Sequence, residues 1–208
     1  MWKSRASLKL RACPVRIGTA MPPPTDDEAI AATRRWLEVA VIGLNLCPFA
    51  KAVHVKEQIR YVVSEAEDAE ALLQDLVREL RALEEADPET VDTVLLIHPR
   101  ALNDFSDYND FLDVADAAVE ALELSGVLQV ASFHPEYRFA DTEADDISNY
   151  SNRSPYPMLH LLREESIDKA VEVFPEAETI YLKNMETLRK LGIEGWRALG
   201  LPIRKESD

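Results

Sequence analysis

The feature that most constrains this 208-residue chain is an alternation of short apolar runs and amphipathic segments between residues 59 and 133. Three of the runs have the length and composition of strands. They cover residues 59–63, 93–97 and 127–133. Between them, leucines recur at helical spacing over 67–85, and a second helix is expected over 108–124. Long helical crossovers are typical of parallel strands, so this order predicts a βαβαβ unit.

The predicted fold is an α/β domain with a small, three-stranded, mainly parallel sheet. If the strands are arranged in sequence order, right-handed crossovers place both connecting helices on one face. The other face must then be covered by an N-terminal helix, capped by Asp26 or Asp27, and by C-terminal helices over 155–173 and 177–191. A ferredoxin-like α+β sheet is the alternative, because three strands make a small parallel sheet.

A single domain is expected over residues 25–200. Residues 1–24 contain five basic residues, no acidic residue and a run of prolines, which is typical of a disordered basic segment. Residues 201–208 are expected to form a disordered tail. Residues 1–20 also resemble an organelle transit peptide, so targeting is a minor alternative to a cytoplasmic protein.

Composition excludes several classes of function. The formal net charge is −15, and such an acidic surface repels phosphate backbones, so no nucleic-acid partner is expected. No apolar run approaches the roughly 18 residues that a membrane-spanning helix needs, so no membrane association is expected. Cys13 and Cys47 are the only cysteines, which excludes a disulfide scaffold and indicates a reducing compartment.

The first candidate site follows the third predicted strand, where His134, Glu136 and Tyr137 come in close succession. Ligands of open parallel sheets bind beyond the carboxyl ends of the strands. We interpret His134 as a general acid or base and Glu136 as the carboxylate that orients it or shares its proton. Because His98 ends the second strand in the same way, a metal site of His98, His134 and Glu136 is an alternative, although no metal-binding spacing supports it. The structural alternative is that each histidine hydrogen-bonds a loop carbonyl.

A second candidate site lies at the start of the helix expected over 155–173. Ser154 is a good N-cap, and a proline follows at the first helical position. The N–H groups of a helix start attract anions, and Arg153 directly precedes it, while His160 and Arg163 extend a polar stripe along the helix. We therefore expect the two arginines to bind the phosphate or carboxylate group of a small substrate. The pocket wall is completed by Asn152, Tyr137 and His160.

Cys47 begins a Cys-Pro-Phe sequence, which is also found at the active sites of thiol transferases. In those enzymes the cysteine follows a strand and opens a helix, which lowers its pKa, whereas here a helix is expected before it and no second cysteine lies nearby. Cys47 is therefore expected to be a small buried thiol that lines the site.

Together these motifs resemble the DUF1415 family, a group of mostly bacterial proteins of unknown function. The motifs are Leu46-Cys47-Pro48-Phe49, Ser132-Phe133-His134-Pro135-Glu136-Tyr137, and Asn152-Arg153-Ser154-Pro155-Tyr156-Pro157 followed by His160-Leu161-Leu162-Arg163. The resemblance implies a family and no mechanism.

The residues favour a cytoplasmic small-molecule enzyme with an anionic substrate and histidine acid–base chemistry, and they point to no particular cofactor. The alternative is a non-catalytic module that binds a ligand or a protein partner. A metal- or thiol-dependent enzyme is the third possibility.

Overall fold

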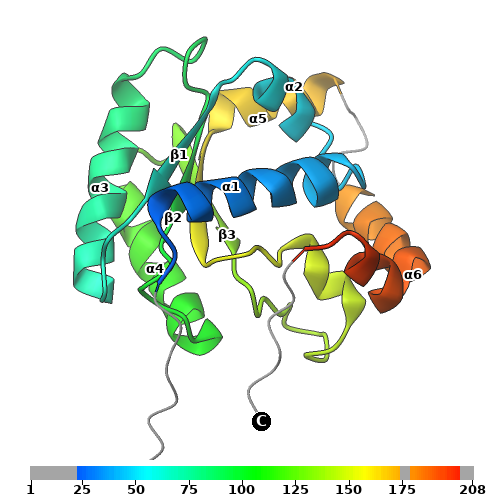
Figure 1. Ribbon diagram of the computed structural model, residues 1–208. Coiled ribbons are helices and arrows are strands. Elements are labelled where there is room, and N and C mark those ends of the chain that lie inside the picture. Colours follow the sequence, from blue (N-terminus) through cyan, green and yellow to red (C-terminus); the bar gives the residue numbers. More distant parts are fainter. Residues whose placement is uncertain (1–22, 174–178, 202–208) are drawn as a thin grey trace, which may run out of the picture.

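The computed structural model describes residues 23–173 and 179–201, which form one four-stranded sheet with helices on both faces (Figure 1). The strands are β1 (Ile59–Val63), β2 (Thr93–Ile97), β3 (Leu128–Phe133) and β4 (Met158–Arg163). The helices are α1 (Asp26–Trp36), α2 (Ala50–Val55), α3 (Ala69–Glu85), α4 (Phe105–Ala121), α5 (Glu164–Val173) and α6 (Ile180–Ala198). Two further segments are the π-helical η1 (Leu37–Ile42) and the 3₁₀-helical η2 (Ile147–Ser151).

The sheet has the order β1-β2-β4-β3. β1 and β2 pair in parallel, whereas β4 lies between β2 and β3 and is antiparallel to both. The predicted α/β class is therefore correct, but the predicted three-stranded, mainly parallel sheet is not. The sheet has a fourth strand, β4, between β2 and β3. The ferredoxin-like alternative is also incomplete: β4 does split the β2–α4–β3 unit, but β1 is parallel to its neighbour β2.

The predicted helix over 155–173 was wrong in its first half, because residues 158–163 form β4. The sequence contains a reason for this. Prolines at 155 and 157 disfavour helical backbone at the residues that precede them, so the chain enters Met158 in an extended conformation. Only the second half of the predicted segment is helical, as α5.

The two faces of the sheet carry separate hydrophobic clusters. Helices α3 and α4 pack together on one face, as expected from two crossovers of the same hand (Figure 1). Helix α1, η1 and α6 contribute to the cluster on the other face, hereafter the α1 face. Leu201, the last described residue, is buried in this second cluster. The predicted N-terminal segment before residue 23 and the tail after Leu201 lie outside the described residues. Within the described residues, no helix combines the length and the hydrophobicity that a bilayer span requires.

Local sequence explains where α1 begins and where η1 ends. Thr25 caps α1 in a capping box with Glu28, one residue before the aspartates expected in that role. The helix widens into η1 and stops at Gly43. A Cβ atom at this position would lie 2.2 Å from the carbonyl oxygen of Val39, so glycine is required there.

Tyr108 of α4 joins the two strands that meet at the split in the sheet. Its hydroxyl donates to the carbonyl oxygen of Met158 at 2.8 Å and accepts the N–H of Phe133 at 3.0 Å. Met158 and Phe133 are paired residues of β4 and β3, so the phenol bridges the end of that ladder. The side chain is fully buried, and burial raises the pKa of the phenol.

We expect Tyr108→Phe to lower the free energy of unfolding by roughly 1–3 kcal/mol, because a buried backbone donor and acceptor both lose their partner. Urea denaturation measures the change. Tyr181→Phe is the matched control, since Tyr181 is 56% exposed and its replacement should change stability by no more than about 0.5 kcal/mol. Equal effects of the two substitutions would contradict the bridging role of Tyr108.

Candidate functional site

The segment between β3 and β4, residues 134–157, contains most of the predicted site residues. Its two ends lie side by side, because the N–H of His134 donates to the carbonyl oxygen of Asn152 at 3.2 Å and the Asn152 side chain donates to Ser132 at 3.1 Å. Asn152 therefore closes the base of the loop. Its amide group is used in doing so, although we predicted that it would line the pocket.

His134 is fully buried at the base of this loop, with its ring against Phe105 and Tyr108. Nδ1 accepts the N–H of Glu136 at 3.0 Å, so Nε2 carries the proton and donates it to the carbonyl oxygen of Leu102 at 3.2 Å. This arrangement matches the structural alternative, a histidine that ends its strand by hydrogen-bonding the loops. The acid–base roles of His134 and Glu136 stay predictions, and the geometry does not favour them.

The histidine pair of the metal alternative is not formed. The ring of Tyr108 lies between His98 and His134, with centroid distances of 5.8 and 5.0 Å, and β4 separates the strands that carry them. His98 donates from Nδ1 to the carbonyl oxygen of Ala101 at 3.0 Å. Across residues 23–173 and 179–201, no three potential metal ligands of the His, Cys, Asp or Glu type come together.

Arg153 holds the loop together from inside. Its Nε donates to the carbonyl oxygen of Tyr137 at 3.1 Å, its Nη2 donates to that of Ala144 at 2.5 Å, and the guanidinium lies 4.5 Å from the ring centroid of Tyr150. The Tyr137 ring packs between Phe105 and Phe139. These two bonds support the loop backbone and use two of the five N–H groups of the guanidinium, and the substrate-binding role of Arg153 stays a prediction.

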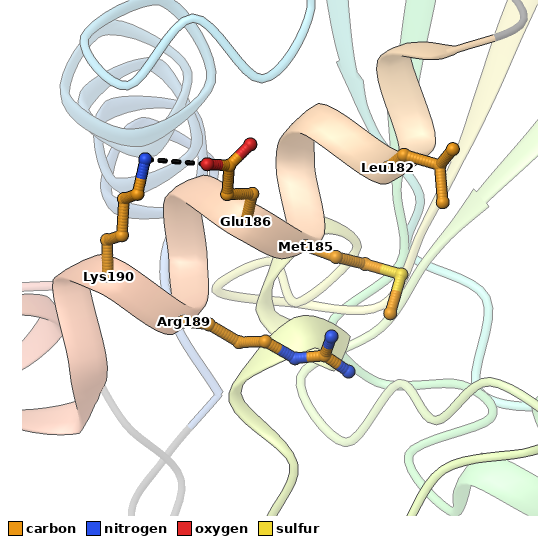
Figure 2. Close-up of a pocket in the computed structure, with 5 residues that line it drawn as sticks. All are labelled: Leu182, Met185, Glu186, Arg189 and Lys190. Carbon is orange, nitrogen blue, oxygen red and sulfur yellow. Dashed lines mark hydrogen bonds and ion pairs between the residues drawn. The ribbon is translucent and has the colours of Figure 1, made fainter.

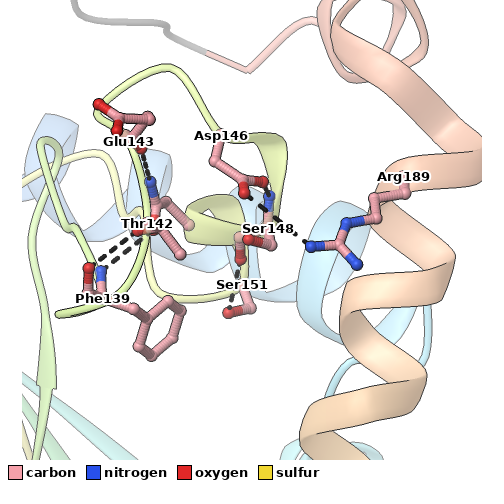
Figure 3. A network of polar contacts seen from close by, with 8 residues as sticks. Phe139, Thr142, Glu143, Asp146, Ser148, Ser151 and Arg189 are labelled. Atoms are coloured by element: carbon pink, nitrogen blue, oxygen red, sulfur yellow. Dashed lines mark hydrogen bonds and ion pairs between the residues drawn. The ribbon is translucent and has the colours of Figure 1, made fainter.

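The middle of the loop is an internal polar network attached to α6 (Figure 3). Asn149 is fully buried and accepts from the N–H of Phe139 at 3.1 Å and from the Thr142 hydroxyl at 2.7 Å. Asp146 caps η2, and its carboxylate lies 4.0 Å from the guanidinium of Arg189 on α6 (Figure 3). These bonds satisfy the loop backbone and leave it well ordered.

Arg163 lies at the far end of β4, about 17 Å of strand away from Met158. Its Nη2 lies 2.5, 2.7 and 3.3 Å from three carbonyl oxygens at and after the end of α3. They belong to Leu83, Ala86 and Val91. The predicted helix start beside Arg153 is absent, and Arg153 precedes β4 whereas Arg163 is its last residue, so the two arginines do not form one shared site. The substrate-binding role of each arginine stays a prediction.

The α1 face of the sheet has a cross-strand row of four residues, of which the sequence prediction had named only His160 as a site residue. Tyr61, Leu95, His160 and Ala131 are direct cross-strand neighbours and therefore point to one face. Leu95 belongs to the α1-face cluster, and His160 packs its ring 6.0 Å from that of Phe133 in the same cluster. Because residues three apart on a strand point to opposite faces, His160 and Arg163 do not share a pocket.

His160 has a defined protonation state. Thr93 donates its hydroxyl proton to the carbonyl oxygen of Leu161 at 2.6 Å, so the 2.8 Å contact between Thr93 and Nε2 of His160 must use a proton on Nε2. Nδ1 then carries a lone pair, and none of the hydrogen bonds among the described residues uses it. Burial lowers the pKa of the imidazole to about 4, so the ring is neutral at physiological pH.

Tyr61 adds a second polar group to this row. Its hydroxyl is buried and has no hydrogen-bond partner within the described part of the chain. The guanidinium of Arg34 lies 4.7 Å from the ring centroid, and burial raises the pKa of the phenol, so the group is protonated. Buried polar groups are usually paired in folded proteins, so an unpaired one is a candidate ligand contact.

Cys47 also lies on the α1 face, packed against its hydrophobic cluster. Burial raises the pKa of the thiol, which lowers the thiolate fraction and weighs against a nucleophilic role. The loop before α2 is tied to α6, because the Asn184 side chain donates to the carbonyl oxygen of Leu46 at 2.9 Å. The expected place of Cys47 as a lining residue stays a prediction.

A groove of about 370 Å³ lies on the surface of α6, lined by Leu182, Met185, Glu186, Arg189 and Lys190 (Figure 2). All five residues come from one helix, and Glu186 and Lys190 form an ion pair at 2.6 Å. None of the polar groups of the sheet lines it. The α1 face therefore remains the better candidate for chemistry.

The chain matches the family model described as "Protein of unknown function (DUF1415)" over residues 28–198. The protein belongs to this family, as the motifs around Cys47, His134 and Asn152 had indicated. No curated protein and no solved structure matches the chain.

We expect Arg163→Met to lower the free energy of unfolding by about 2–4 kcal/mol, because buried carbonyl groups at the end of α3 lose a charged donor. Arg163→Lys, which retains a cation, should cost less. Chemical denaturation measures both. A fully stable Arg163→Met variant would show that the three short contacts contribute little.

The buried His98 predicts a stability loss in acid. Burial lowers its folded-state pKa from 6.5 to about 4, so between these values the unfolded chain binds a proton that the folded chain does not. Stability is therefore fully present above pH 6.5 and falls by about 3 kcal/mol as the pH drops to 4. In His98→Asn, whose amide can still donate to Ala101, the free energy of unfolding should depend less steeply on pH. An unchanged slope in urea titrations across this window would refute the assignment.

Proposed function

We propose that this protein is a small-molecule enzyme whose ligand binds against the α1 face of the sheet, with Nδ1 of His160 exchanging a proton with it. The observation that carries the proposal is the hydrogen bond from Nε2 of His160 to Thr93, which fixes the tautomer and directs the lone pair to Nδ1. Thr93 is a positioning residue in this scheme, and His160 is the group that contacts the ligand.

The charge state of His160 suits an acidic ligand. An imidazole with a pKa near 4 is a weak base, so it stays unprotonated at physiological pH while no ligand is bound. A ligand that brings a negative charge close to the ring would raise this pKa, because the charge favours the imidazolium form. Binding of a small anion would thus be coupled to proton uptake, which keeps the expectation of an anionic substrate but moves it to a different face of the sheet.

Arg34 is the cation that supports this placement. Its guanidinium lies against the ring of Tyr61, two strands away from His160 in the same row, or about 10 Å at the usual strand spacing. Burial raises the pKa of the Tyr61 phenol, the Arg34 guanidinium lowers it and the Glu38 carboxylate raises it. The Glu38 carboxylate also lies 3.5 Å from the ring of His54. A small ligand between Tyr61 and His160 would reach both polar groups.

A non-catalytic ligand-binding module is the second candidate, because the same groups can bind without turnover. To distinguish the enzyme from the module, the protein is incubated with each ligand that binds, and the ligand is then analysed by mass spectrometry. Recovery of every such ligand unchanged favours the module, and conversion favours the enzyme.

The test of the site is a thermal-shift screen of small carboxylic acids, phosphorylated metabolites and carbonyl compounds. A ligand at about 100 times its Kd stabilises the native state by about 2.7 kcal/mol, which raises Tm by several degrees in a domain of this size. We expect His160→Phe to remove this shift, since phenylalanine keeps the ring packing against Phe133 but lacks Nδ1.

Glu136→Gln is the matched control because it changes a carboxylate of the loop site instead. It should leave the shift intact. A shift that is lost in Glu136→Gln and kept in His160→Phe would return the site to the carboxyl ends of the strands. A shift that survives both substitutions would exclude both the His160 site and the site of Glu136 and His134 as the place where the ligand binds.

A further inference from the structure

We infer that the ligand of the α1 face presents a carboxylate or carbonyl oxygen to the indole N–H of Trp36. This inference rests on the proposed function and deepens it, because it specifies the chemical class of the ligand. It starts from a donor in α1 that the packing of the helix alone does not require.

Trp36 is the last residue of α1 and is 3% exposed. Its Nε1 has no hydrogen-bond partner within residues 23–173 and 179–201. An indole nitrogen is a donor only, so whatever satisfies it must supply an acceptor atom. A phenylalanine or leucine would fill this position without leaving a buried donor.

The indole lies close to the proposed proton acceptor. Its ring meets the ring of Phe133 edge-on at a centroid distance of 5.3 Å, and Phe133 lies 6.0 Å from His160. Trp36 and His160 therefore pack against the same aromatic ring. A ligand that contacts Nδ1 of His160 is within reach of the indole.

Two other buried polar groups, one on α1 and one on β1, also lack hydrogen-bond partners within the described residues. The hydroxyl groups of Thr33 and Tyr61 are buried without partners among the described residues, and both can donate. The cation of Arg34 lies over Tyr61. This set of donors beside a cation complements oxygen acceptors and repels an ammonium group through the charge of Arg34.

The two contacts together describe the ligand. It needs an acceptor oxygen for Trp36 and a transferable proton or hydrogen-bond donor for Nδ1 of His160. A small carboxylic acid or 2-oxo acid that binds as its anion together with one proton from solution meets both needs. The proton lies between one ligand oxygen and Nδ1, and another ligand oxygen accepts from the indole. Primary amines of similar size, in their charged form, lack the acceptor.

The experiment uses ¹H–¹⁵N spectra of the full chain, which contains three tryptophans, Trp2, Trp36 and Trp196. Trp36→Phe assigns the indole resonance of Trp36. The protein is titrated with acetate, benzoate, pyruvate and phenylpyruvate, and with ethylamine and benzylamine as matched amines. We expect at least one acid to move the Trp36 indole resonance downfield. Trp196, equally buried but packed on Tyr150, is the internal reference and should not respond.

Removing the indole donor should also weaken the acid that binds. Trp36→Phe is expected to raise its Kd about tenfold, the effect of losing one hydrogen bond to a charged acceptor. If Trp36→Phe fails to fold, the titration of the wild-type protein still decides the question. In that case Trp2→Phe and Trp196→Phe assign the other two indole resonances, and the third belongs to Trp36.

The outcomes separate this inference from the proposed function. If acids stabilise the protein in a His160-dependent way while the Trp36 resonance stays fixed, the inference fails and the proposed function stands. If the amines move the resonance as far as the acids do, the inference fails as well. If none of the acids binds and the indole contacts only an internal water, the inference fails, and the His160-dependent thermal-shift screen decides the proposed function separately.

Discussion

Strand β4 holds the sheet together, because it supplies the hydrogen-bond partners of both β2 and β3. Without it, one side of β2 and the inner side of β3 would have unpaired backbone groups. Tyr108 reinforces the arrangement from α4 by bridging the end of β3 and the start of β4. Because β4 lies between β2 and β3, its His160 is in the middle of the α1 face and has a cross-strand neighbour on each side. The architecture of the sheet and the candidate site thus share one origin.

Much of the fold follows from local patterns. The bounds of β1 and β2 agree with the sequence prediction, and α3, α4 and β3 differ from it only at their ends. β4 was missed because Met158–Arg163 is rich in leucine, which suits a buried helix as well as a central strand. The prolines at 155 and 157 favoured the strand, but strand order depends on pairing between segments far apart in the chain, which local periodicity does not encode.

The candidate site was harder to predict, for a physical reason. A long segment without regular structure must pair its own backbone groups, so residues 134–157 are rich in asparagine, aspartate, serine and arginine. Active sites use the same residue types, and composition alone does not separate the two. Asn149, Asn152 and Arg153 show the structural use. Tyr61, Thr93 and His160 lie in three separate strands, and only the register of the sheet brings them onto one face.

The position of β4 has a consequence for synthesis. It is the last strand to be made, yet it lies inside the sheet, so a nascent chain that ends before residue 158 has β1, β2 and β3 but not the strand that separates the last two. During that interval β2 presents an open edge, and the nearest strand of matching direction is β3. Direct pairing of these two would give the simple parallel sheet that the sequence suggests at first sight. On the ribosome, that arrangement is the competitor that the arriving β4 has to displace.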